Sequence, residues 1–173
     1  MIPFKELVTE RMVLRAPKAS DAGPMHLFAS DLRVAAMTTS IPHPYPPGAA
    51  QSYLDGVVSR LDKEVLWSID ASPSGGAEFV GLIVARHVDS EIGYWVGPPF
   101  WRTGYATEAA AEVTRYLIDE CGHAVVTATV FVDNLASQAV MRKAGFRQDG
   151  DLLQFSVARA TEVRSLRFVH DAG

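Results

Sequence analysis

Backbone amides between residues 102 and 107 are the groups in this sequence whose arrangement is most suited to chemistry. The segment Arg102-Thr-Gly-Tyr-Ala106 follows a strand-like stretch and leads directly into residues with helical spacing. Glycine in such a turn lets the backbone approach a ligand closely, and the first amides of a helix have no partner within the helix. Because these amides and the positive end of the helix dipole point at one place, the segment could bind phosphate oxygens. Several classes of nucleotide-binding protein would fit this signal.

The elements on both sides of this segment are readable from local signals. Residues 91–96 alternate as a half-buried strand, which Gly97-Pro98-Pro99 ends. A helix is predicted from just after Gly104 to a glycine cap at Gly122. Its apolar face consists of Ala106, Ala109, Ala110, Val113, Leu117 and Cys121. The apolar stretch 124–132 predicts a buried strand after the helix, so the right-handed crossover makes the two flanking strands parallel.

The rest of the chain predicts one α+β domain over residues 1–173. Strands over 65–71 and 79–88 precede the 91–96 strand through short turns, so antiparallel pairing is expected. Other expected elements are a first strand within 7–16, a helix capped by Ser20-Asp21, a helix over 49–61, a short helix over 135–144 and a final hairpin over 146–169. The proline-rich stretch 41–47 excludes regular structure, and either lines a substrate entrance or is a surface connector.

Composition excludes several classes of function. A net charge of -4 gives no electrostatic signature for nucleic acid. No apolar run is long enough to cross a bilayer, and charged residues near the N-terminus argue against a signal peptide. Cys121 is the only cysteine and reads as a buried structural thiol, and the five histidines have no metal-site spacing, so no catalytic metal is predicted. We therefore expect a cytoplasmic protein that binds neither nucleic acid nor membrane.

Three motifs carry a resemblance to a known family. They are Glu91-Ile-Gly-Tyr-Trp-Val, Trp101-Arg-Thr-Gly-Tyr-Ala-Thr-Glu-Ala and Val132-Asp-Asn-Leu-Ala-Ser-Gln-Ala-Val-Met-Arg-Lys-Ala-Gly-Phe146. Together they resemble the GNAT acetyltransferases, and more narrowly the Rim-type branch, which acetylates N-terminal α-amines of ribosomal proteins and includes members with other amine acceptors. The resemblance spans nearly the whole chain. It implies an α/β/α sandwich-like fold whose mixed, mostly antiparallel sheet has a splayed central parallel strand pair.

The resemblance also implies which residues bind acetyl-CoA. Backbone at Val96, where the parallel strands separate, would pair with the pantetheine arm, and the side chains of Asn134 and Ser137 would lie beside the pantetheine and the sulfur. The pyrophosphate would bind the amides of Arg102, Thr103, Gly104, Tyr105, Ala106 and Thr107.

Two positions depart from the family pattern. Trp101 occupies a position that is usually Gln or Arg, and Arg102 stands where the branch often has glycine. If the native backbone at 102 has a positive φ, arginine is strained there. Alternatively, its guanidinium adds a charge-assisted bond to phosphate, which is the interpretation we favour.

Acetyl transfer to an amine requires a proton acceptor and a stabilised leaving thiolate. Glu91 is our candidate acceptor, against the alternative of a surface or salt-bridged glutamate. The N–H near Val96 could stabilise the oxyanion. Ser137 is the candidate donor to the thiolate, or simply a residue of the first helical turn. Many family members use a tyrosine as the acid, but no tyrosine follows Asn134 here, so the family pattern assigns no residue of this chain to that role.

These residues predict an acetyl-CoA-dependent N-acetyltransferase that works by direct attack in a ternary complex. The resemblance favours a protein N-terminal α-amine as acceptor. Alternatives are a small amine, an amino acid or an antibiotic, and a catalytically silent acyl-CoA-binding module. The resemblance also allows a homodimer.

Overall fold

One continuous sheet forms the centre of the molecule. The computed structural model describes residues 1–173, and its eight strands are ordered β1-β2-β3-β4-β5-β6-β8-β7. Every neighbouring pair is antiparallel except β5 and β6, which are parallel. The strands are β1 Leu7–Val8, β2 Val13–Arg15, β3 Glu64–Asp70, β4 Gly81–Arg86, β5 Glu91–Val96, β6 Val125–Phe131, β7 Arg147–Ser156 and β8 Thr161–Asp171. The predicted mixed, mostly antiparallel sheet is confirmed.

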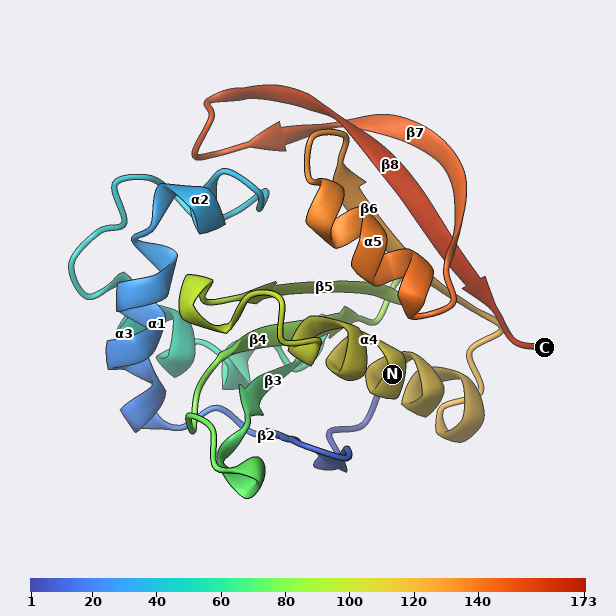
Figure 1. Cartoon of the computed structure of the whole chain (residues 1–173), viewed down its shortest axis with the longest axis horizontal. Coiled ribbons are helices and arrows are strands. Elements are labelled where there is room, and N and C mark those ends of the chain that lie inside the picture. Colours follow the sequence, from blue (N-terminus) through green and yellow to red (C-terminus); the bar gives the residue numbers. More distant parts are fainter.

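Helices cover both faces of the sheet, and Figure 1 shows α4 and α5 in front of the strands. The α-helices are α1 Ala22–Ala29, α2 Leu32–Ala35, α3 Ala49–Asp55, α4 Tyr105–Arg115 and α5 Leu135–Lys143. A π-helical turn, Tyr116–Glu120, prolongs α4, and Gly122 follows with a φ of 74°, as predicted for the helix end. None of the helices combines the length and the apolar character needed to cross a membrane.

Two apolar cores lie on opposite faces because side chains alternate along the strands. The larger core packs Ile83 and Ile92 of the sheet against Val113 of α4 and Met141 of α5. The smaller core joins α1 and α3 to the other face, and its members are Met25, Phe28, Ala50, Leu66, Phe79 and Leu82. Strand β5 contributes to both cores and therefore separates them.

The first strand is shorter than predicted. Instead of one strand within residues 7–16, the chain forms β1 and β2, which pair as a small antiparallel hairpin. Thr9 explains the interruption, since its amide donates to the Met12 carbonyl at 2.9 Å and its Oγ1 accepts the Met12 amide at 3.0 Å. The predicted helix over 49–61 is likewise interrupted after α3, and only a short 3-10 turn, Val58–Arg60, follows.

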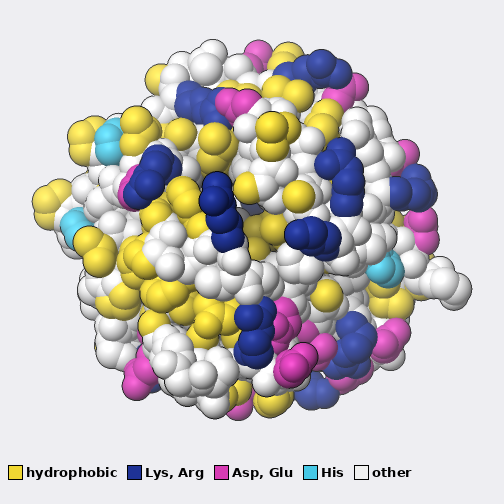
Figure 2. Space-filling view, in the orientation of Figure 1, with side chains coloured by type: hydrophobic (Ala, Val, Ile, Leu, Met, Phe, Trp, Pro, Cys, Tyr) yellow, Lys and Arg dark blue, Asp and Glu magenta, His cyan; other side chains and the backbone are white.

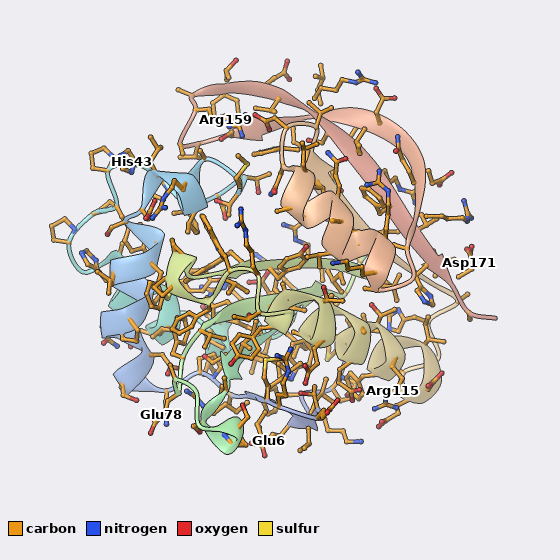
Figure 3. All side chains as sticks on the ribbon, in the orientation of Figure 1. Glu6, His43, Glu78, Arg115, Arg159 and Asp171 are labelled. Atoms are coloured by element: carbon orange, nitrogen blue, oxygen red, sulfur yellow. The ribbon has the colours of Figure 1, made fainter.

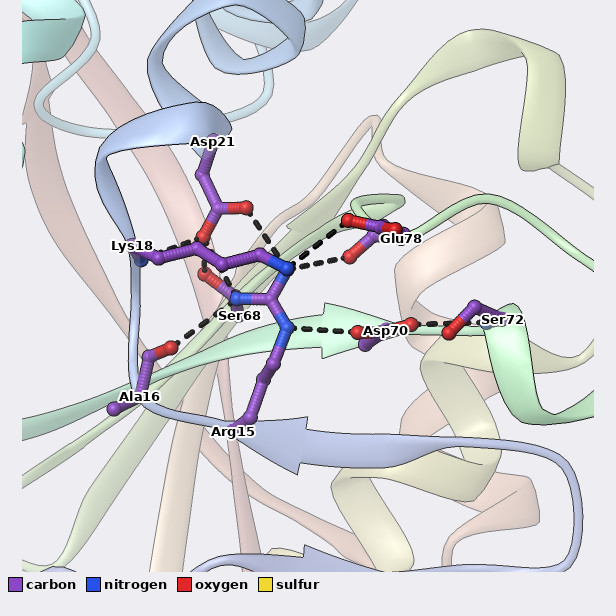
Figure 4. A network of polar contacts seen from close by, with 8 residues as sticks. All are labelled: Arg15, Ala16, Lys18, Asp21, Ser68, Asp70, Ser72 and Glu78. Atoms are coloured by element: carbon purple, nitrogen blue, oxygen red, sulfur yellow. Dashed lines mark hydrogen bonds and ion pairs between the residues drawn. The ribbon is translucent and has the colours of Figure 1, made fainter.

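A buried ionic cluster holds β2, β3 and the start of α1 together (Figure 4). Arg15 donates to both carboxylate oxygens of Asp21, at 2.8 and 2.9 Å, and to Asp70 at 2.7 Å. Asp21 occupies the N-cap position of α1 as predicted, but its carboxylate makes no bond to that helix and accepts from the Ser68 hydroxyl and the Lys18 amide instead. Burial alone would raise the pKa of Asp21, but these hydrogen bonds outweigh burial and lower it below 3.8.

Candidate functional site

Strands β5 and β6 separate soon after they meet. Their parallel pairing is confined to Glu91 with Thr127 and Ile92 with Ala128. The antiparallel ladder with β4 continues to the bond from the Gly97 amide to Val80, at 2.8 Å. Ladder bonds alternate along an antiparallel strand, so the peptide groups of Tyr94 and Val96 point away from β4 and into the gap. The predicted splay is therefore present, and it begins at Tyr94, two residues before Val96.

Trp101 closes one side of this gap. Its indole Nε1 donates to the Val96 carbonyl at 2.7 Å, so that carbonyl already has a partner. The amide of Val96 and the peptide groups of Tyr94 are then the backbone groups of β5 that a ligand in the gap could bind. An extended ligand arm could occupy the place of a missing strand here.

The loop between β5 and α4 has the conformation of an anion site. Gly104 has a φ of 83° and precedes the first residue of α4, and the first helical bond runs from the Glu108 amide to the Gly104 carbonyl at 3.0 Å. The preceding amides, those of Tyr105, Ala106 and Thr107, therefore have no partner within the helix and lie at its positive end. This arrangement supports the predicted phosphate cradle.

Arg102 has both a positive φ and an unpaired guanidinium, the two features considered for it from the sequence. Its φ is 61°, the positive value that a non-glycine residue adopts only with strain. Its side chain is exposed and forms no ion pair. Strain and a guanidinium free to bind phosphate therefore coexist at this position.

Arg11, which is far from this loop in the sequence, bonds to it directly. The sequence did not identify this contact. Its Nη1 donates to the Thr103 carbonyl at 2.8 Å, and its Nε donates to Glu108 at 2.8 Å. Glu108 also accepts the Thr9 hydroxyl at 2.6 Å, so the β1–β2 hairpin is bonded to the first turn of α4. The adjacent guanidinium also adds positive charge beside the cradle.

Asn134 and Ser137 lie at the start of α5, as predicted. The Asn134 side chain accepts the Ser137 amide at 3.1 Å and caps the helix. The Ser137 hydroxyl lies 2.6 Å from the phenolic oxygen of Tyr94, which reaches it from β5. Burial raises the pKa of Tyr94 to about 12, and the hydrogen bond with Ser137 partly offsets that rise. No tyrosine follows Asn134 in sequence, yet the fold places one against Ser137.

Glu91 lies on the opposite face of β5. Its carboxylate forms an ion pair with Arg86 and accepts the Thr129 hydroxyl at 2.8 Å. The Glu91 side chain is 15% exposed, against 50% for that of Arg86. The glutamate is thus salt-bridged in the resting protein, which is compatible with a catalytic role because a carboxylate offers about four lone-pair sites.

A cleft of about 390 Å³ extends through the gap in the sheet and joins Glu91 to the start of α5. Glu91 and Trp95 line it from one face, and Tyr94, Asn134 and Ser137 line it from the other. Figure 2 shows apolar side chains gathered over the middle and left of the molecule, with Lys and Arg side chains around them.

The proline-rich loop lines this cleft. Thr38, Thr39, Ser40, Ile41, Pro42, Tyr45 and Pro46 all contribute to its wall. His43 points outward from the same loop at the edge of the molecule (Figure 3). The sequence left two interpretations of this stretch, the lining of an entrance and a surface connector. Its position in the wall of the cleft fits the first.

Arg159 bonds the last hairpin to the end of α2, which precedes this loop. Figure 3 shows it at the turn between β7 and β8, near α2. It donates to the Ala36 carbonyl at 2.6 Å and to Asp133 at 2.8 and 3.1 Å. The hydrogen bond to Arg159 lowers the pKa of Asp133, against the opposing effect of burial. The wall of the cleft is thereby joined to the residue that precedes the Asn134 cap.

The chain belongs to the acetyltransferase (GNAT) domain family, whose model matches residues 11–147. It is 32% identical to an uncharacterised N-acetyltransferase, YoaA of Bacillus subtilis strain 168, over 102 residues that make up 56% of each protein. The match thus spans a little over half the length of this relative.

Solved structures share the fold. The chain superposes on RimL, a ribosomal L7/L12 α-N-protein acetyltransferase in complex with coenzyme A, with a TM-score of 0.81 and 15% identity, covering 96% of this chain and 98% of RimL. It superposes on the microcin C7 self-immunity acetyltransferase MccE, in complex with acetyl-CoA and AMP, with a TM-score of 0.81 and 16% identity, covering 94% and 93% of the two chains. The predicted GNAT fold is confirmed.

No group of three or more His, Cys, Asp or Glu side chains is placed to hold a metal ion.

Proposed function

We propose that this protein is an N-acetyltransferase that moves the acetyl group of acetyl-CoA to a primary amine by direct attack in a ternary complex. The observation that supports this most strongly is the cleft that passes through the splayed strands, with an anion cradle at the start of α4 and a capped helix at α5. A thioester in that gap is accessible from both faces of the sheet. The cofactor and the acceptor can therefore be bound at the same time.

Residues on the α4 and α5 face would hold acetyl-CoA. The amides of Tyr105, Ala106 and Thr107 would bind the pyrophosphate, with Arg102 as a further cation. The pantetheine arm would follow the peptide groups of Tyr94 and the amide of Val96, as an added strand does. The amide of Val96 or a neighbour would also lie near the thioester oxygen, where a donor stabilises the oxyanion.

Glu91 would accept the proton that the attacking amine loses, directly or through water. An amine near its solution pKa is mostly protonated at neutral pH, so the reaction needs such an acceptor. The carboxylate lines the cleft and keeps lone pairs beyond those used by Arg86 and Thr129. Ser137 would donate a hydrogen bond to the departing sulfur from the opposite side of the gap.

The walls of the cleft support an acceptor amine carried by an uncharged, apolar group. Aromatic and aliphatic side chains dominate them, among them Met25, Tyr53, Leu66, Leu82 and Trp95. The charged residues of the lining are Arg86 and Glu91, which neutralise one another. A polyamine would need further carboxylates for its other ammonium groups. An N-terminal α-amine on an apolar residue and a small apolar amine share the required chemistry.

Release of free CoA thiol tests this function. Purified protein would be incubated with acetyl-CoA and one acceptor at a time. The acceptors are peptides with apolar N-terminal residues, small aromatic amines, free amino acids and spermidine. Turnover with the first two classes, above the rate without acceptor, is the expected result. If acetyl-CoA binds but no acceptor accelerates thiol release, the chain is a silent acyl-CoA-binding module and the proposal is wrong.

A further inference from the structure

Tyr94 and Ser137 form an isolated pair of hydroxyl groups at the edge of the cleft. The phenolic oxygen lies 2.6 Å from Ser137 Oγ and 3.5 Å from the Ser137 carbonyl oxygen. Both residues line the cleft, Tyr94 from the middle of β5 and Ser137 from the first turn of α5. The hydrogen bonds of the phenol thus involve a single residue, and that residue lies where the CoA sulfur would leave.

The direction of the short bond follows from counting donors and acceptors. A phenol has one proton, and the acceptors within its reach are the two oxygens of Ser137. The carbonyl at 3.5 Å is at the limit of a hydrogen bond, so a phenol that donated there would lose most of the interaction. The count therefore favours Tyr94 as the donor to Ser137 Oγ. The proton of Ser137 then remains free to point into the cleft.

We infer that Tyr94 is a positioning residue for the leaving group, because its hydrogen bond to Ser137 directs the serine proton at the departing CoA sulfur. This inference rests on the proposed acetyl transfer. A pair of coupled hydroxyls also makes the outer hydroxyl a stronger donor, since hydrogen bonds in a chain polarise one another.

The chemistry requires no proton transfer from either hydroxyl. Attack by the neutral amine forms the C–N bond, and collapse of the intermediate breaks the C–S bond with its electron pair left on sulfur. The proton lost by nitrogen passes to Glu91 or to water. A thiol with an ordinary pKa of about 8.5 is a far stronger acid than serine, so Ser137 keeps its proton and stabilises the thiolate through a hydrogen bond. Tyr94, with its raised pKa, stays protonated throughout.

The thiol pKa of bound CoA tests this assignment directly. Thiolate formation would be followed by ultraviolet absorbance as the pH of the protein–CoA complex is raised, in wild type, Tyr94→Phe, Ser137→Ala and the double variant. In wild type, we expect the thiol pKa of bound CoA to be lower than that of free CoA. In each of the three variants, the thiol pKa of bound CoA should rise above the wild-type value by the same amount. In acetyl transfer, kcat should fall by about tenfold or more, as for loss of a hydrogen bond to a charged group, while KM for acetyl-CoA changes little.

Tyr116→Phe is the matched control. Tyr116 also donates one hydrogen bond from a phenol, to the Pro3 carbonyl at 2.7 Å, but it lies in the π-helical turn after α4 and does not line the cleft. Its loss should lower thermal stability without changing the thiol pKa of bound CoA. A fluorinated tyrosine at position 94 is the alternative probe if Tyr94→Phe folds poorly. It keeps the hydroxyl and makes it more acidic, so kcat should be restored to the wild-type level.

Different results refute the two proposals. If Tyr94→Phe binds CoA with the wild-type thiol pKa and the wild-type kcat, Tyr94 does not position Ser137, although the acetyltransferase activity stands. If Ser137→Ala is also unchanged, the leaving thiolate is stabilised elsewhere. If the wild-type protein binds no CoA, the proposed function itself is wrong.

Discussion

Two substitutions at Arg102 separate the backbone strain of the phosphate loop from its charge. Arg102→Gly removes both the guanidinium and the cost of a φ of 61°, whereas Arg102→Ala removes the guanidinium and keeps the strained backbone. A left-handed conformation costs a non-glycine residue about 1–2 kcal/mol. The greater freedom of glycine in the unfolded chain takes back about 0.4–1 kcal/mol of this gain. The glycine variant should therefore be about 1 kcal/mol more stable than the alanine variant.

Thermal unfolding and calorimetric titration with acetyl-CoA would measure the two effects. For a chain of this length, about 1 kcal/mol corresponds to a difference of about 2–4 °C in Tm. Both variants should bind acetyl-CoA about fivefold more weakly than wild type at low salt, the loss of one exposed charge on phosphate. Added salt should narrow that gap, because it screens exposed charges. Wild-type affinity of Arg102→Ala at low salt would refute the phosphate contact, and equal Tm values would refute the strain.

Further predictions concern two charged residues, Arg15 and Glu91. Arg15→Met should lower the free energy of unfolding by about 3–5 kcal/mol in urea titrations at neutral pH, because it leaves Asp21 and Asp70 buried without a cation; a loss below about 1 kcal/mol would contradict this. In wild type, stability from the lowered pKa values of both carboxylates is present above 3.8 and lost as the pH falls through the folded values. In Arg15→Met, burial raises those pKa values, so its deficit should shrink, not grow, as pH falls toward 4. Glu91→Gln should reduce kcat/KM about 10²–10⁴-fold, because the attacking amine loses its proton acceptor, and a wild-type kcat/KM would exclude Glu91 from that role.

Local signals were sufficient for the elements that build the site. Residues 91–96 form a strand as predicted, because alternation defines its length and two prolines end it. Gly104 precedes the helix as predicted, with a φ of 83°, and Asn134 caps α5. Each of these features depends on residues within one turn or one strand of one another. Such patterns leave a direct trace in the sequence.

The missed contacts join residues far apart in the chain. Tyr94 meets Ser137 across 43 positions, and Arg11 reaches the Thr103 carbonyl across 92. Alternation along β5 did place Tyr94 on the same face as Ile92 and Val96, which is the signal that could have directed attention to it. Nothing comparable marks Arg11, because a surface arginine in a short hairpin has no periodicity to follow. The assumed cap at Asp21 failed for the same reason, since Arg15 and Ser68 compete for its carboxylate.

Strand β5 divides the proposed reaction between two faces of one sheet. Successive side chains point to opposite faces, so Glu91 faces the apolar acceptor cleft and Tyr94 faces α5 and the expected position of the sulfur. The gap beyond Ile92 is what allows both to act on one thioester, because a sheet continuously paired there would separate them. Changes on the acceptor face should therefore alter the dependence on the amine, and changes at Tyr94 should alter the dependence on the leaving thiol. The changes in activation free energy caused by one substitution on each face should therefore add in the double variant. A non-additive result would indicate that the proton lost by nitrogen passes to the sulfur within the site.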